Sequence, residues 1–388
     1  MWIFTSPSTL VFGEDALHHL EELQGERAFL VTDANLRRLG LAERVAEPLR
    51  QAQMAVTIFD QVEPEPSIQT VYRGVERMRE LEPDWIVAVG GGSCMDAAKA
   101  MWALYERPDL VPEELSPLYS LGVHRARMVA VPTTSGTGSE VTWMMVLTDA
   151  ENHRKLGLGN RELVPTVALV DPEMTRDLPP AITADTGLDA LTHAVEAFVA
   201  TFRNDLTDPL CLQAAALVFA YLPRAVERGA ADMEAREKMA YAATIAGLAF
   251  GNAWVGLAHA LGHSLGGHFR VPHGRAVALF LPYVVEFNAQ GGVVRYAAMA
   301  RHLDLGDGEP GEGAQPLVGA VRELERAVGQ PTTLQELGID RAALEAALPT
   351  LCENALTDNA ILGTPRPPEW EELEKLFRYA WEGRPVDF

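Results

Sequence analysis

The chain has 388 residues, of which 48% are hydrophobic and 22% are charged, a composition typical of a globular protein long enough for two domains. Its formal net charge of −22 argues against nucleic acids and anionic membrane surfaces as partners, because both require a basic surface. Cys94, Cys211 and Cys352 are far apart and odd in number, which is typical of a reducing cytoplasm and not of a disulfide scaffold.

Two segments bear on targeting and on membranes. Residues 1–17 lack a basic start and a sustained apolar core, so we expect no signal peptide. Residues 239–258 carry no formal charge over a length that could span a membrane. Because this segment is rich in Ala and Gly and contains Asn252, we interpret it as a buried, tightly packed helix.

Residues 1–180 alternate short apolar runs with amphipathic helical patterns. The runs are rich in β-branched residues and flanked by turn or helix-start residues, which predicts buried parallel strands at 28–32, 85–89, 128–131 and 167–170. Between them, apolar periodicity predicts helices over 36–51 and 68–81. This alternation predicts a doubly wound α/β sheet, in which ligands bind beyond the carboxyl ends of the strands.

The pattern changes after Leu178-Pro179-Pro180. No convincing strand follows, and long helical patterns cover residues 183–200, 209–227, 233–250 and 369–381. The Gly-rich and acidic stretch 305–316 is predicted to be an exposed loop. We therefore predict a Rossmann-like α/β domain over 1–180 and an all-α domain over 181–388, with a cleft between them.

Three consecutive glycines follow the strand predicted at 85–89. Gly90, Gly91 and Gly92 allow the backbone to approach a ligand closely, and Ser93 can cap the helix that follows. The free N–H groups and the helix dipole would then face an anion such as a pyrophosphate. A plain tight turn between a strand and a helix explains the same residues, so this loop alone leaves both interpretations open.

A second loop, PTTSGTGSE, follows the next predicted strand. Its hydroxyl groups come from Thr133, Thr134, Ser135, Thr137 and Ser139. Because parallel strands end at one edge of a sheet, this loop would bring uncharged donors to the glycines. The alternative is a flexible linker, although linkers seldom follow a buried strand so tightly.

Acidic and imidazole side chains gather in the second half of the chain. Asp189 and His193 are four residues apart on the helix predicted at 183–200, so they can share a cation or form a charge-assisted pair. Residues 259–274 then hold four of the ten histidines, namely His259, His263, His268 and His273. This concentration favours a metal site, and spacing alone nominates His259 and His263 as the other two ligands.

Four motifs together resemble the iron-containing alcohol dehydrogenase family. They are GGGSxxDxAK at 90–99, TTSGTGSEVT at 133–142, DALTHAVEAF at 189–198 and HxxxH…PHG at 259–274. The resemblance spans almost the whole chain. It implies a Rossmann-like cofactor domain joined to a helical metal domain, as in dehydroquinate synthase, and NAD(P)-dependent interconversion of alcohols and aldehydes with Fe²⁺ or Zn²⁺.

The resemblance also implies roles for individual residues. The metal ligands would be Asp189, His193, His259 and His273, with the Pro-His-Gly turn folding His273 onto the cation. The dinucleotide would contact Gly91, Gly92, Ser93, Asp96, Thr133, Thr134, Thr137 and Lys155. His263 would then be free to act as a proton carrier beside the nicotinamide and the substrate. Cys94 and His268 are expected to be packing or surface residues.

The choice between NAD and NADP turns on Asp33, at the end of the strand predicted at 28–32. Its carboxylate can accept hydrogen bonds from an adenosine ribose, or it can cap the helix that begins near Asn35. In the first case its charge would repel the 2′-phosphate of NADP. We therefore predict a preference for NAD(H), which Asp33→Gly would relax.

Other functions remain open at this stage. A glycerol dehydrogenase-like or other dehydroquinate synthase-fold enzyme shares the architecture and the cation. A metallohydrolase would leave the two loops without a role, and a non-enzymatic NAD-binding protein would leave the metal ligands unexplained. By its position in the family, the apolar Met144 favours a short or medium unbranched alcohol or aldehyde over a polyol. The apolar MWIF and LVF runs near the N-terminus predict a homodimer or a multiple of it.

Overall fold

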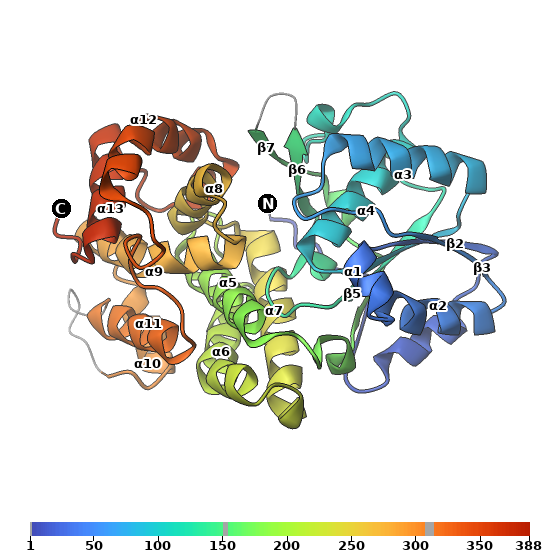
Figure 1. Ribbon diagram of the computed structural model, residues 1–388, viewed down its shortest axis with the longest axis horizontal. Coiled ribbons are helices and arrows are strands. Elements are labelled where there is room, and N and C mark those ends of the chain that lie inside the picture. Colours follow the sequence, from blue (N-terminus) through green and yellow to red (C-terminus); the bar gives the residue numbers. More distant parts are fainter. Residues whose placement is uncertain (1, 150–153, 307–313) are drawn as a thin grey trace. The chain divides into compact units, whose positions relative to one another are not determined.

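The computed structural model describes residues 2–149, 154–306 and 314–388. It divides into two compact units, Met1–Leu178 and Pro179–Phe388 (Figure 1). All the strands of the described residues lie in the first unit. The described residues of the second unit form helices and their connections. Most of the loop predicted at 305–316 lies outside the described residues.

The first unit is built on a six-stranded sheet in which every neighbouring pair is parallel. The spatial order is β1 (Thr9–Phe12), β8 (Val167–Val170), β5 (Arg127–Pro132), β4 (Trp85–Gly90), β2 (Arg27–Val31) and β3 (Ala55–Phe59). The four predicted strands are confirmed as β2, β4, β5 and β8. The two edge strands, β1 and β3, were not predicted.

Helices cover both faces of this sheet, as Figure 1 shows for α2 on one side and for α3 and α4 on the other. Successive side chains of β2 point to opposite faces of the sheet, so they pack against different helices. Ala28 and Leu30 pack with η1 (Ala16–Glu22) and α2 (Leu41–Gln51). Phe29 and Val31 pack with α3 (Ile68–Leu81) and α4 (Gly92–Glu106). The prediction of a doubly wound α/β sheet is confirmed.

The helix predicted over 36–51 is interrupted. Gly40 adopts a left-handed conformation with φ of 80°, which separates α1 (Ala34–Arg38) from α2. The helix predicted over 68–81 is α3 with the same bounds. A separate antiparallel hairpin, β6 (Met144–Asp149) and β7 (Arg154–Gly159), follows the second loop and was also not predicted.

The helical unit is organised around α5 (Pro180–Val199), in which nearly every residue from Thr183 onward is buried. It packs against α6 (Asp208–Arg228), α7 (Met233–Ala253) and α9 (His273–Gln290). A second group pairs α8 (Leu257–Phe269) with α9 and α12 (Arg341–Thr357). The outer elements are α10 (Tyr296–His302), α11 (Gln315–Ala327), η7 (Asn359–Gly363) and α13 (Trp370–Glu382). The four helices predicted in this half are confirmed as α5, α6, α7 and α13.

The uncharged segment 239–258 is buried for most of its length, but it is not one helix. α7 ends at Ala253, and Trp254 has a φ of 76°, so α8 sets off at 106° to α7. Among the described residues, only Asp208–Ala231 is a single helix long and apolar enough to cross a membrane, and α7 with α8 qualifies only as a bent pair. Core helices of globular proteins meet the same criteria, so this is weak evidence for a membrane span.

Candidate active site

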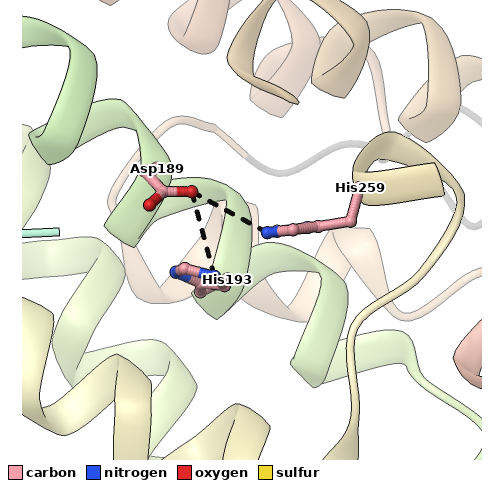
Figure 2. A group of neighbouring side chains, drawn as sticks. All are labelled: Asp189, His193 and His259. Carbon is pink, nitrogen blue, oxygen red and sulfur yellow. Dashed lines mark ion pairs between the residues drawn. The ribbon is translucent and has the colours of Figure 1, made fainter. Parts of the chain in front are cut away.

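One carboxylate oxygen on α5 lies at the centre of an imidazole cluster (Figure 2). Oδ1 of Asp189 lies 3.8 Å from Nε2 of His193, one turn further along the helix. It lies 3.7 Å from Nε2 of His259 on α8 and 3.4 Å from Nε2 of His273 on α9. The ligand atoms of Asp189, His193 and His259 are all within 4.8 Å of one another. The structure therefore brings together the four residues that the resemblance nominated.

His273 reaches this cluster in a different way from the one expected. It is the first residue of α9, with Pro272 at the N-cap position, so the Pro-His-Gly stretch begins a helix and does not form a turn. Gly274 explains the approach: a Cβ at this position would lie 2.2 Å from the backbone oxygen of Asp185 on α5. Without a side chain there, α9 can start directly against α5 and bring His273 to Asp189.

The atoms in this cluster have the chemistry of a cation site. Nε2 of His259 and Oδ1 of Asp189 are buried, and within the described ranges neither has a hydrogen-bond partner. Nδ1 of His259 lies 2.5 Å from Oε2 of Glu196. In the tautomer that donates from Nδ1 to this carboxylate, Nε2 has a free lone pair. Two acceptors 3.7 Å apart with no proton between them are satisfied by a metal ion that accepts both nitrogen and oxygen ligands.

Burial also sets the protonation of the ligands. It lowers the pKa of His193 and His259 to about 3, so both rings are neutral at pH 7, the form that binds metals. The ring of His193 stacks on Phe250 of α7 with centroids 4.1 Å apart, which gives the site one apolar wall. Fe²⁺ and Zn²⁺ both suit a site of three imidazoles and one carboxylate.

His263 is next to the cluster and has a different partner. Its Nδ1 is 2.8 Å from Oδ2 of Asp358, and its ring stacks on His273 with centroids 5.2 Å apart. Burial alone would raise the pKa of Asp358, but the charge and hydrogen bond of His263 hold it below its usual range. His268 is exposed and lies against Phe269, as expected for a surface residue.

Two residues at this site were not predicted from the sequence. Glu196 is buried beneath His259, and its signal was available because it follows Asp189 and His193 at seven and three residues, on the same face of α5. Asp358 is 95 residues away from His263 in the chain, and no local pattern points to it.

In the first unit, the glycine loop and the hydroxyl-rich loop meet at one edge of the sheet. β4 and β5 pair in register up to Gly90 and Pro132, and Thr133 N donates to Gly90 O at 3.0 Å. A Cβ at Gly91 would lie 3.1 Å from Oγ1 of Thr134, and one at Gly92 would lie 3.1 Å from Cγ2 of Thr137. A side chain at either position would therefore crowd the opposing loop, and glycine avoids this.

The start of α4 differs from the prediction. Ser93 does not cap the helix, because α4 begins at Gly92 and its N-cap is Gly91, which has no side chain. The hydroxyl of Ser93 instead accepts a hydrogen bond from Glu65 N at 3.4 Å. The first amide groups of a helix have no partner within it, so this uncapped start suits an anion such as a phosphate.

Asp33 caps α1, as one of its two interpretations required. Oδ1 accepts hydrogen bonds from Asn35 N and Leu36 N, both at 2.8 Å, and Oδ2 lies 3.8 Å from Sγ of Cys94. This geometry leaves the ribose interpretation open. β2 and β4 are neighbours at the point where the chain order of the sheet reverses, so Asp33 and the glycine loop share the position where such sheets bind ligands.

The other predicted cofactor residues belong to networks around the loops. Asp96 on α4 accepts from Ser139 Oγ at 3.0 Å and from Val146 N at 2.9 Å. Lys155 on β7 pairs with Glu65 at 2.6 Å, and Glu65 is also bonded to Ser93. The fully buried Lys99, which was not predicted, donates to Ser139 Oγ at 2.8 Å, and burial lowers its pKa to about 8.

Comparison with protein families assigns both halves of the chain. Residues 7–172 match the model described as iron-containing alcohol dehydrogenase, and residues 183–381 match the C-terminal model of the same family. The chain belongs to the iron-containing alcohol dehydrogenase family. It is therefore an oxidoreductase that interconverts alcohols and aldehydes.

Three relatives illustrate the similarity. The NADPH-dependent butanol dehydrogenase of Clostridium saccharobutylicum is 39% identical over 100% of both chains. A crystal structure of 1,3-propanediol oxidoreductase has a TM-score of 0.92 at 35% identity and covers 98% of this chain and 100% of that one. The sulfoacetaldehyde reductase of Bifidobacterium kashiwanohense, solved in complex with NAD⁺, has a TM-score of 0.86 at 30% identity over 98% of each chain.

Proposed function

We propose that this iron-containing alcohol dehydrogenase uses a divalent cation and NAD(H) to interconvert small primary alcohols and aldehydes. The observation that carries the proposal is the pair of acceptors, Asp189 Oδ1 and His259 Nε2, which face each other in a buried site. In this proposal Asp189, His193, His259 and His273 hold Fe²⁺ or Zn²⁺. Residues 1–180 bind the dinucleotide and residues 181–388 bind the metal.

Different residues of the chain bind the cation, limit the access of water and transfer the proton. A divalent cation supplies Lewis acidity to an alcohol or carbonyl oxygen, and a nicotinamide supplies or accepts the hydride. Asp189 and the three imidazoles hold the cation, and the Phe250 ring beside His193 limits the access of water. His263 has its Nδ1 paired with Asp358, so its Nε2 is left to exchange the proton of the reaction.

The cofactor contacts are assigned to the first unit. Gly91, Gly92 and Ser93 offer backbone donors to the diphosphate, and Thr133, Thr134 and Thr137 line the opposing loop. Asp96 and Lys155 complete the proposed contacts with the dinucleotide, and they also bond to Ser139 and Glu65. One relative is NADPH-dependent and another was solved in complex with NAD⁺, so cofactor choice has to follow from this chain's own residues, and Asp33 favours NAD(H).

For the substrate we propose an unbranched apolar alcohol or aldehyde of short or medium length. The butanol dehydrogenase relative acts on such a compound. The test is a panel of butanal and propanal, assayed with NADH, and of 1,3-propanediol and glycerol, assayed with NAD⁺. The protein is assayed after its metal has been removed and replaced by Fe²⁺, Zn²⁺ or Mg²⁺. We expect butanal reduction only with Fe²⁺ or Zn²⁺, and none with an Asp189→Asn control.

Each competing function has its own outcome in this assay. Full activity of the metal-free protein would contradict the metal assignment. Turnover of glycerol with no reduction of butanal would favour a glycerol dehydrogenase-like enzyme. Failure of the protein to enhance NADH fluorescence would favour a metallohydrolase, and NADH binding without turnover on any metal would favour a non-enzymatic protein.

We also propose a homodimer or a multiple of it, formed through the N-terminal segment. Trp2, Ile3 and Phe12 are 64%, 58% and 62% exposed, and Phe12 belongs to the edge strand β1. Light scattering at micromolar concentration should give at least twice the 42.3 kDa of one chain. Phe12→Asp places a charge on the edge strand and should shift the mass toward the monomer. Leu118→Asp, at a residue 91% exposed, is the control and should leave the mass unchanged.

The protein is assigned to the cytoplasm on the basis of its cysteines. Cys94, Cys211 and Cys352 are all free and buried, which suits a reducing compartment. The partners proposed for this acidic chain are its substrate, its cofactors and its own copies, with no nucleic acid or membrane.

A further inference from the structure

We propose that Glu196 is a positioning residue for the metal centre, which fixes the ring of His259 with its proton on Nδ1 and ties that ring to the first turn of α8. This inference rests on the metal site of the proposed function. It concerns a residue that is not one of the proposed metal ligands and that acts on the metal centre through His259.

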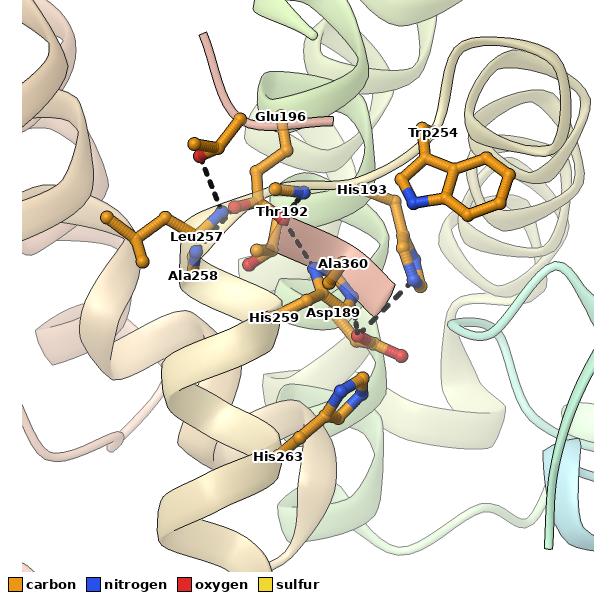
Figure 3. A network of polar contacts seen from close by, with 12 residues as sticks. Asp189, Thr192, His193, Glu196, Trp254, Leu257, Ala258, His259, His263 and Ala360 are labelled. Carbon is orange, nitrogen blue, oxygen red and sulfur yellow. Dashed lines mark hydrogen bonds and ion pairs between the residues drawn. The ribbon is translucent and has the colours of Figure 1, made fainter. Parts of the chain in front are cut away.

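The face of α5 that carries the metal ligands also carries Glu196. Asp189, His193 and Glu196 follow one another at four and three residues, so their side chains project from one side of the helix. Glu196 is 4% exposed, and its Oε2 is 2.5 Å from Nδ1 of His259. Figure 3 shows this carboxylate between the start of α8 and the ring of His259.

The other partners of Glu196 decide which way the ring proton points. Gly256 N donates to Oε2 at 3.0 Å, and Ala258 N donates to Oε1 at 2.6 Å. Both of these bonds stabilise the ionised form of Glu196, which can only accept. Toward that form His259 donates from Nδ1, its one N–H as a neutral imidazole. Its Nε2 is left as a lone pair that faces Asp189, as a metal ligand requires.

A comparison with His193 shows how specific this support is. Within the described part of the chain, Nδ1 of His193 has no hydrogen-bond partner, and that ring stacks on Phe250 and on His259, with centroids 4.1 Å and 4.6 Å away. The ring of His259 is instead oriented by one hydrogen bond to a buried carboxylate. Loss of that bond should affect His259 directly and His193 only through the stacking of the two rings.

The same carboxylate also caps a helix, so the two roles must be separated. α7 ends in the strained backbone of Trp254, and α8 begins three residues later with amide groups that need acceptors. Thr364 shares the capping role, because its Oγ1 accepts from Leu257 N at 3.1 Å. Thr364 is 2% exposed, and it supports this turn through Leu257 and not through His259. Thr364→Val is thus a matched control that removes a cap alone.

The experiment compares Glu196→Gln, Thr364→Val and the wild type. The dissociation constant for Zn²⁺ is measured by competition with a chelator, and thermal unfolding reports the loss of the cap. Removing a partner that orients a metal ligand typically weakens metal binding by about 10- to 100-fold. We expect this change for Glu196→Gln and a change below about 3-fold for Thr364→Val, with a lower Tm for both.

A second readout tests the ring itself. In metal-free wild-type protein with ¹⁵N-labelled histidine, we expect His259 to have its proton on Nδ1, and Glu196→Gln should reduce the population of that tautomer. Equal metal affinity in wild type and Glu196→Gln would overturn the inference, as would equal losses in the two variants. If Glu196→Gln does not fold, a wild-type His259 protonated on Nε2 would overturn it. A wild type that binds no metal would instead defeat the proposed function, while the tautomer still tests Glu196.

Discussion

His273→Ala is expected to empty the metal site, whereas His263→Ala is expected to keep the metal and lose turnover. Nε2 of His273 lies 3.4 Å from Asp189 Oδ1, the shortest of the three imidazole distances to that oxygen. Removal of this side chain, which is 38% exposed, also opens the site to water. Loss of a direct ligand should therefore weaken metal binding by more than the roughly 10- to 100-fold typical of an outer partner.

The expectation for His263 follows from its pairing with Asp358 and not with Asp189. If it carries the proton of the reaction, His263→Ala should lower kcat by about 10²- to 10⁴-fold and change the pH dependence of the rate. Metal analysis of both purified variants decides the assignment, with His268→Ala as an exposed control that should behave like wild type. Metal retention in His273→Ala together with loss in His263→Ala would reverse the assignment and favour the His259–His263 pair that spacing alone suggested.

The sequence identified the strands that are buried on both sides and missed those at the edges. β2, β4, β5 and β8 read as apolar runs because helices cover both of their faces. β3 is short and only partly buried except at Phe59, so its side chains give no continuous apolar signal. β1 has the same character, with Phe12 exposed. The position of Gly40 explains why one helical pattern became two helices, since its left-handed backbone separates the end of α1 from the start of α2.

At the site, local spacing predicted the ligands on α5. The ligands on α8 and α9 were assigned from the resemblance. Asp189 and His193 are recognisable because four residues make one turn of α5. The choice of His273 over His263 depends on how α9 starts against α5, which in turn depends on the missing side chain of Gly274. Contacts such as Asp358 with His263 depend on packing between distant segments, and no pattern within a single segment encodes them.

Asp33→Ser is expected to raise the use of NADPH relative to NADH. A carboxylate beside the adenosine ribose meets the 2′-phosphate as a like charge, which costs about 4 kcal/mol at 4 Å with an effective dielectric constant near 20. Salt at physiological strength screens part of this repulsion, so we expect the ratio of kcat/KM for the two cofactors to change by about 10- to 100-fold. Steady-state kinetics with both cofactors measures this ratio.

Serine is a sharper probe than glycine at this position because Asp33 also caps α1 through Asn35 and Leu36. Ser is as good an N-cap as Asp, so the substitution removes the charge and keeps the helix start. Asp340→Ser is the matched control, since Asp340 caps α12 in the same way through Ala342 and Ala343. It removes the same charge from another helix start and should leave the cofactor ratio unchanged. If the wild type uses NADPH better than NADH, or if Asp33→Ser leaves the ratio as it was, Asp33 is a helix cap only and cofactor choice lies with other residues of the loops.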